Sequence, residues 1–167
     1  MDHVLALASR AGTALALALV TASCGSNGPP PEELVPVPST PPTLRVDVGT
    51  GMLDFIELAD GESVDLVKGG QGGFHVWTAI RVHDERLADV QVNLTTRLDD
   101  GTPGGSPSSA ATTLTAPRDG ARAAAGLRSF IDSAQLVRGR RLVLRVEVIA
   151  GDKQHGSAEK VVTIRSK

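Results

Sequence analysis

The sequence predicts an all-β domain in residues 44–167, built as an antiparallel sandwich of about seven or eight strands. Apolar and polar residues alternate through most of this region, as they do in strands that bury one face. Glycine and aspartate, which favour turns, recur between the alternating segments roughly every 8–12 residues. Strands and helices do not alternate regularly, so we expect a single antiparallel domain rather than a parallel α/β sheet.

The first half of the domain contains five expected strands. Three short segments come first and two long ones follow: 44–48, 55–58, 63–67, 74–82 and 90–98. Between the second and third segments lies Asp60-Gly61, a pair that tolerates the positive φ of a hairpin turn, so we expect those two strands to pair. The glycine-rich stretch Gly69–Gly73 leads into a strand. Phosphate-binding glycine loops lead into a helix, so we expect a strand connection here instead.

The second half leaves one segment open between two structures. A loop of glycine, serine and proline is expected at 99–110, and two clear strands at 142–148 and 158–164 close the domain. In residues 121–137, apolar side chains recur at helical spacing and alanine favours a helix. The alternative is a strand at 126–131 and then a short helical turn capped by Asp132 or Ser133.

The closing segment, GLRSFIDSAQLVRGRRLVLRVEVIAGDKQHGSAEKVVTI, resembles the final strands of bacterial immunoglobulin-like domains. In that family a short helical turn links the last two crossings between sheets, so the resemblance favours the strand and turn over the helix. It implies an immunoglobulin-like β-sandwich. No functional residue is carried over, because the domain lacks the cysteine pair and the tyrosine of antibody domains.

The N-terminus has the pattern of an export signal in residues 1–23. Its uncharged apolar run, 11–22, is shorter than the roughly 20 residues that a membrane-spanning helix needs. The run ends in Ala22-Ser23-Cys24, which resembles the lipobox of bacterial lipoproteins, although Thr21 stands where leucine is usual. The resemblance implies cleavage before Cys24 and lipidation of this residue, the only cysteine of the chain. The alternative is an ordinary signal peptide followed by an incidental cysteine.

Residues 24–43 are expected to form a tether. They contain most of the chain's 10 prolines, which disfavour both helix and sheet, so we expect a disordered, extended linker. Together these features predict a bacterial cell-envelope lipoprotein. Its domain would lie in the periplasm or at the cell surface, with the outer membrane favoured over the inner one.

The strand at 74–82 provides the candidate binding surface. Its alternation directs Phe74, Val76 and the apolar residues after them into the core, so the intervening His75, Trp77 and Arg81 point outward. An outward tryptophan provides a surface on which a sugar ring or a partner protein can pack. The alternative is that a loop covers Trp77, or that Arg81 lies over its ring as a cation–π pair.

The sequence offers little support for catalysis, metal binding or nucleic-acid binding. His75 and His83 are separated by about 27 Å along an extended strand, too far to share a metal ion. Serines at 106–109 form no nucleophile elbow, and the basic residues do not cluster as nucleic-acid binding requires.

We therefore expect a non-catalytic module without cofactor or metal that binds an envelope protein or a glycan. The alternative function is a calcium- or metal-dependent module that uses four acidic turns: 60–62, 99–101, 119–120 and Asp152.

Overall fold

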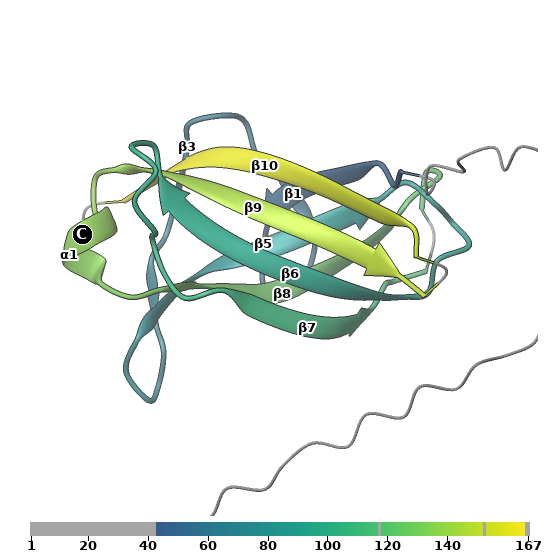
Figure 1. Ribbon diagram of the computed structural model, residues 1–167, viewed down its shortest axis with the longest axis horizontal. Coiled ribbons are helices and arrows are strands. Elements are labelled where there is room, and N and C mark those ends of the chain that lie inside the picture. Colours follow the sequence, from purple (N-terminus) through teal and green to yellow (C-terminus); the bar gives the residue numbers. More distant parts are fainter. Residues whose placement is uncertain (1–42, 117, 152, 166–167) are drawn as a thin grey trace, which may run out of the picture. The chain divides into compact units, whose positions relative to one another are not determined.

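The computed structural model describes residues 43–165, apart from Pro117 and Asp152 (Figure 1). The expected signal peptide, Cys24 and most of the proline-rich tether lie outside the described residues. Within the described part of the chain, no helix has both the length and the apolar composition to span a bilayer.

Ten strands and one helix of a single turn make up the described domain. The strands are β1 (Val46–Thr50), β2 (Ile56–Glu57), β3 (Glu62–Val64), β4 (Val67–Lys68), β5 (Phe74–Val82), β6 (Asp89–Leu98), β7 (Ser108–Thr113), β8 (Arg122–Ile131), β9 (Arg141–Ala150) and β10 (His155–Ile164), and the helix is α1 (Ala134–Val137). The expectation of an all-β domain is confirmed.

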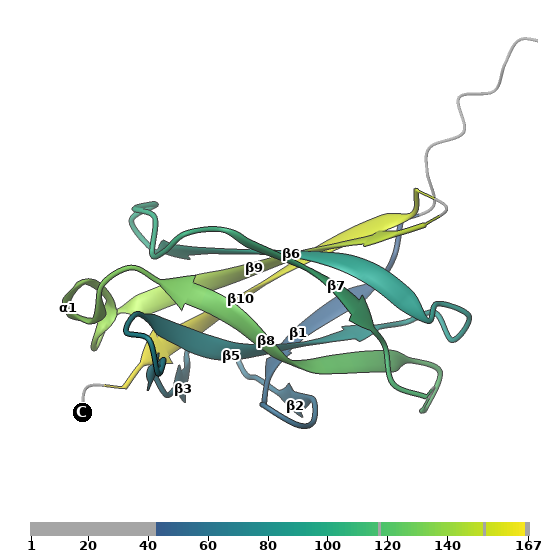
Figure 2. The same ribbon diagram turned by 90° about the horizontal axis from the view of Figure 1, so that it is seen from below.

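The strands form two sheets that lie one over the other (Figure 2). In the first, which we call the β5 sheet, β5 pairs with β1, β4 and β8, and β2 extends it beyond β1. In the second, the β9 sheet, the order is β3-β10-β9-β6-β7. All pairings between named strands are antiparallel except that of β3 with β10, which is parallel.

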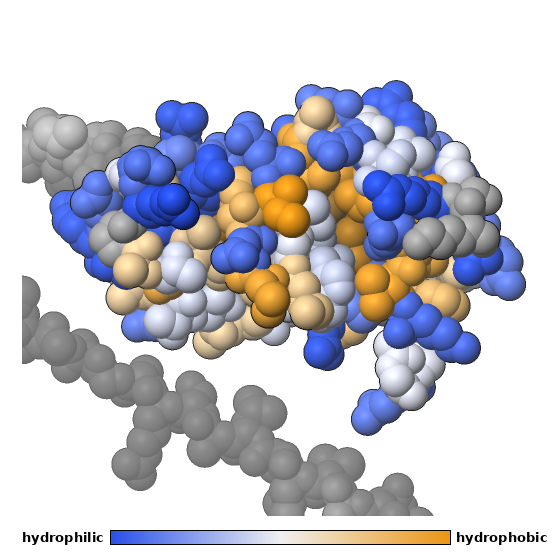
Figure 3. All heavy atoms as spheres, turned by 180° about the vertical axis from the view of Figure 1, so that it is seen from behind, coloured by the Kyte–Doolittle hydropathy of each residue, from blue (hydrophilic) through white to orange (hydrophobic). Residues whose placement is uncertain are grey.

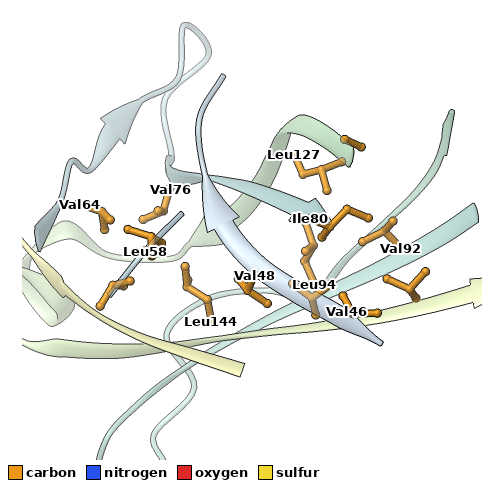
Figure 4. Packing of buried hydrophobic residues seen from close by; sticks show 14 of the residues in the cluster. Val46, Val48, Leu58, Val64, Val76, Ile80, Val92, Leu94, Leu127 and Leu144 are labelled. Atoms are coloured by element: carbon orange, nitrogen blue, oxygen red, sulfur yellow. The ribbon is translucent and has the colours of Figure 1, made fainter. Parts of the chain in front are cut away.

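Apolar side chains from the facing sides of both sheets form one core (Figure 4). Val76 and Ile80 of β5 and Leu144 of β9 are fully buried there. The core also holds one polar pair, Thr78 and Ser129, whose hydroxyl groups lie 2.7 Å apart and hydrogen-bond to each other. This pair satisfies two groups that would otherwise be costly to bury. The expected alternation of β5, β6 and β9 is thus confirmed on the core side.

The expected pairing across Asp60-Gly61 is wrong. A turn does form there, with Gly61 at a φ of +80°, but the segments on its two sides enter different sheets. β2 pairs with β1, whereas β3 runs parallel to β10. A second difference is β7, which occupies the end of the expected loop at 99–110 and pairs with β6.

Residues 121–137 form a strand and a turn rather than one helix. β8 begins at Arg122, four residues before the expected strand, and it pairs with β5 along its length. Ser133 then occupies the N-cap position of α1, although its side chain makes no capping hydrogen bond. The chain passes through α1 from the β5 sheet to the β9 sheet.

Candidate binding groove on the outer face of the β5 sheet

The register of three strands creates a row of side chains on the outer face of the β5 sheet. His75 of β5 lies opposite Val67 of β4 on one side and opposite Phe130 of β8 on the other. Two residues further along β5, on the same face, Trp77 lies opposite Arg128. Because residues directly opposite each other in a sheet share a face, these five side chains form one continuous outer surface.

A loop covers the neighbouring part of this face and forms one wall. Residues 51–55 cross over the sheet from β1 toward β8, where the Gly126 amide donates a 3.0 Å hydrogen bond to the Gly51 carbonyl. Gly126 has a φ of +73°, and a Cβ atom there would lie 2.8 Å from the Met52 carbonyl oxygen. A glycine at this position therefore permits both the backbone conformation and the close approach of the loop.

The glycine-rich stretch forms the opposite wall. Gly69–Gly73 turns the chain from β4 into β5, with hydrogen bonds from the Gly69 amide to the Gly73 carbonyl and from the Gly72 amide to the Gly69 carbonyl. Gly72 and Gly73 have φ values of +87° and +73°, so this turn depends on glycine. The expectation of a strand connection is confirmed.

Beside the glycine-rich wall lies an open hollow of about 910 Å³, whereas the 51–55 loop borders a smaller hollow through Gly51. The lining of the larger hollow includes His75, Trp77 and Phe130, and Phe130 is 42% exposed. Trp77 also lines the smaller hollow, of about 250 Å³, next to Thr50. We call the two hollows together the Trp77 groove. Figure 3 shows this side of the domain, where apolar side chains gather in the middle of the face between hydrophilic margins.

His75 lies on the expected face but is covered, with only 7% of its surface exposed. Its ring meets the Trp77 ring edge-on, with 4.6 Å between the ring centres. Within the described residues, its Nε2 is the one buried side-chain nitrogen or oxygen without a hydrogen-bond partner. Burial, and then the charge of Arg128, lower the pKa of His75 below its ordinary value of 6.5. The ring is therefore neutral at pH 7.

Trp77 is half-buried, and its ring is approached by a different arginine from the expected one. The guanidinium of Arg128 lies 5.6 Å from the Trp77 ring centre. Arg81 lies instead over Phe55, 4.1 Å from the ring centre, and 3.8 Å from the Asp47 carboxylate. The alternative of an Arg81–Trp77 cation–π pair is wrong, and Arg81 lines neither hollow of the Trp77 groove.

Sequence reasoning missed two residues of the groove, Phe130 and Arg128. Both lie in residues 121–137, for which the sequence left a helix and a strand open, and neither is near Trp77 in the sequence. Only the pairing of β5 with β8 brings them beside Trp77 and His75.

In the acidic turn at 99–101 of the alternative metal site, Asp100 is held by protein partners. Asp100 accepts hydrogen bonds from the Thr102 amide and from Arg140, which lower its pKa to about 2. Among the described residues, no three histidine, cysteine, aspartate or glutamate side chains converge as a metal ion would require. Asp152 lies outside the described residues.

Comparisons with known proteins assign no family to this chain. No protein-family model matches the sequence, and no curated protein matches it either.

Proposed function

We propose that this chain is a non-catalytic lipoprotein that presents an immunoglobulin-like domain for binding at the bacterial cell envelope. In this proposal, residues 1–23 direct export, Cys24 carries the acyl chains, and residues 24–43 tether the domain of residues 44–167 to the membrane. The ligand is an envelope protein or glycan, and the Trp77 groove is the surface that receives it.

The observation that carries the proposal is the aromatic lining of the larger hollow. Trp77 and the exposed Phe130 line this open hollow together with the buried His75, whereas the 51–55 loop crosses the same sheet face at Gly126. Aromatic side chains and arginine are enriched at interaction surfaces, where they supply large contact areas. A row of aromatic side chains with Arg128 at its edge is such a surface.

The groove supports binding better than catalysis. Ser106, Asp132 and His75 line the same hollow, but the Ser106 hydroxyl donates directly to the Asp132 carboxylate over 3.0 Å. His75 hydrogen-bonds to neither, because its Nε2 has no partner among the described residues. A hydrolytic serine requires a base within hydrogen-bond reach, and this serine contacts only a carboxylate that lacks the intervening imidazole.

The anchor is tested by the change Cys24→Ser. We expect the variant to leave the membrane fraction and to lack the mass of the acyl chains. A variant that stays in the membrane fraction with an unchanged mass would refute lipidation at Cys24.

The binding surface is tested by Trp77→Ala with Ile149→Ala as its control. Ile149 is an exposed apolar residue of the β9 sheet, so its truncation leaves the Trp77 groove intact. After crosslinking in the native membrane, we expect Trp77→Ala to recover at least about ten-fold less of the partner that the wild-type chain captures. Its cooperative thermal unfolding should persist. Loss of cooperative unfolding would instead make Trp77 a core residue.

A further inference from the structure

We propose that the ligand of the Trp77 groove is an acidic segment of a partner protein, in which a bulky apolar side chain is flanked by carboxylates. The inference rests on the proposed binding function and narrows its ligand from protein or glycan to one chemical class. Three features of the groove support it: its charge, its apolar rim and its one unsatisfied polar atom.

The charge of the larger hollow favours an anionic ligand. Lys68 and Arg128 line the larger hollow, and neither forms an ion pair with a carboxylate anywhere in the described residues. The acid of this hollow, Asp132, already accepts hydrogen bonds from both the amide and the hydroxyl of Ser106. Two cations and one engaged carboxylate leave the larger hollow net positive on a chain whose formal charge is −2. The smaller hollow is lined by Glu62, Asp65 and Arg165, so the carboxylates of the ligand are expected in the larger hollow.

The rim of the groove favours a protein over a glycan. Ile56, which lines the smaller hollow, is 56% exposed. Met52 and Leu53, which follow Gly51 of the same lining in the chain, are 55% and 80% exposed. Aliphatic side chains contact other proteins through their apolar area, whereas sugar rings stack on open aromatic faces. Arg128 already lies over the Trp77 ring, so it reduces the open aromatic area available for stacking.

The floor of the groove supplies an unsatisfied polar atom. His75 is more than nine-tenths buried and lines the hollow, and its Nε2 lacks a hydrogen-bond partner. A buried polar atom without a partner is destabilising in the free protein, so a ligand group that hydrogen-bonds to the ring gains affinity from this atom.

The first experiment identifies the preferred peptide without assuming its sequence. A display library of random heptapeptides is selected on the full-length chain in detergent and counter-selected on Trp77→Ala. We expect the enriched peptides to combine aspartate or glutamate with leucine, isoleucine or phenylalanine. A consensus that is basic or free of acids, or no enrichment over the counter-selection, would overturn the inference.

The second experiment measures affinity with the protein's own fluorescence. Trp77 is the only tryptophan of the chain, so its emission reports on the groove when a synthetic tryptophan-free peptide of the consensus is titrated. We expect Lys68→Glu and Arg128→Glu each to weaken binding by about ten-fold or more, and high salt to weaken it as well. Arg141→Glu, at an exposed arginine of β9, should change it by less than about two-fold. Thermal unfolding of each variant verifies the fold, and unchanged binding in both folded charge reversals would contradict the inference.

A titration with a glycan distinguishes failure of the acidic-peptide ligand from failure of the proposed binding function. An oligomer of N-acetylglucosamine is titrated in the same way and is expected to leave the Trp77 emission unchanged. If the oligomer binds and the peptide does not, the protein ligand is wrong but the binding function stands. If neither binds and Trp77→Ala still captures as much partner as the wild type in the native membrane, the Trp77 groove is not the binding surface and the proposed function fails at this site.

Discussion

The two outer faces of this sandwich differ in how their polar groups are satisfied. On the β9 sheet, the Glu159 carboxylate forms ion pairs with Arg97 at 3.0 Å and with Arg145 at 3.3 Å. Asn93 and Glu147 form a further cross-strand contact at 3.4 Å. Polar side chains of neighbouring strands thus pair with one another, as on a face that is exposed to water.

The outer face of the β5 sheet is arranged differently. At one end of β5, Asp47 of β1 pairs with Arg81 and His83. Around Trp77, however, the polar members are His75, whose Nε2 has no partner among the described residues, and Arg128, whose guanidinium lies over Trp77 rather than beside a carboxylate. Four of the five exposed large hydrophobic side chains in the described residues belong to this sheet or to its covering loop: Met52, Leu53, Ile56 and Phe130. The comparison indicates that the polar side chains on the outer face of the β9 sheet are satisfied in water. The outer face of the β5 sheet around Trp77 would instead be stabilised by contact with a partner.

The largest effect is expected where the covering loop meets the β5 sheet. Gly126→Ala places a Cβ atom 2.8 Å from the Met52 carbonyl oxygen on a residue with a φ of +73°. We expect the free energy of unfolding to fall by about 2 kcal/mol, measured by urea denaturation. The Trp77 emission should also change, because the loop that ends the groove shifts.

Gly70→Ala is the matched control for this change. Gly70 lies in the other wall, where its Cβ atom would meet nothing within 4 Å, and its φ lies outside the left-handed region. We expect its free energy of unfolding to stay within about 0.5 kcal/mol of the wild type. If both glycine variants unfold at the same denaturant concentration, the loop is not held at Gly126.

The second effect concerns the buried imidazole. His75→Leu removes the unpartnered Nε2 but also the ring contact with Trp77, so at pH 7.5 the free energy of unfolding should stay level or rise by about 1 kcal/mol. The folded-state pKa of His75 is lowered, so below pH 6.5 the unfolded chain binds the proton first. Stability is therefore complete above pH 6.5 and is lost as the pH falls toward the folded-state pKa.

The variant His75→Asn distinguishes the effect of protonating the imidazole from the effect of packing a side chain at this position. Asparagine keeps a buried polar group but does not titrate, so this variant should be less stable than His75→Leu at pH 7.5. Both variants should lose less stability than the wild type when urea denaturation is repeated at about pH 5. A wild-type loss equal to that of both variants would show that His75 contributes nothing to the pH dependence.

The sequence predicted the parts of the fold that depend on local alternation. β9 places aliphatic residues at every second position, and β5 does so at Val76, Ile80 and Val82, so their core faces could be identified without a structure. β7 could not, because SSAATT contains no large apolar residue. It is a strand because β6 pairs with it from Asp89 opposite Thr113 to Leu94 opposite Ser108.

The groove was only partly predictable for the same reason. The outward direction of Trp77 follows from alternation, but its neighbours depend on which distant strand lies beside it. Arg128 and Phe130 enter the groove through the β5–β8 register, whereas Arg81 lines neither of its hollows. Asp60-Gly61 shows the same limit: turn chemistry predicted a reversal, but not which strands would pair afterwards.

A smaller effect is expected on the satisfied face. Glu159→Gln removes the charge that two arginines share, and all three side chains are at least one-third exposed. Exposed ion pairs contribute little, so we expect a loss below about 1 kcal/mol in urea denaturation, which shrinks further in 1 M salt. Partner capture in the native membrane should not change. A large loss of capture would extend the binding surface to the β9 sheet and invalidate the contrast between the faces.

The smallest effect is expected at Asp100, in the turn after β6, and it depends on acid. The Thr102 amide and Arg140 hydrogen-bond to the Asp100 carboxylate and lower its pKa from 3.8 to about 2. Its contribution to stability is therefore present above pH 3.8 and is lost as the pH falls toward 2. Asp100→Asn keeps an acceptor for Thr102 but loses the charge, so the variant should melt slightly below the wild type at pH 7. The two melting temperatures should converge near pH 2, and a constant difference down to that pH would mean that the carboxylate charge does not stabilise this turn. Because the Asp100 carboxylate is satisfied within the protein, unlike His75 in the groove, its loss should leave peptide binding at Trp77 unchanged.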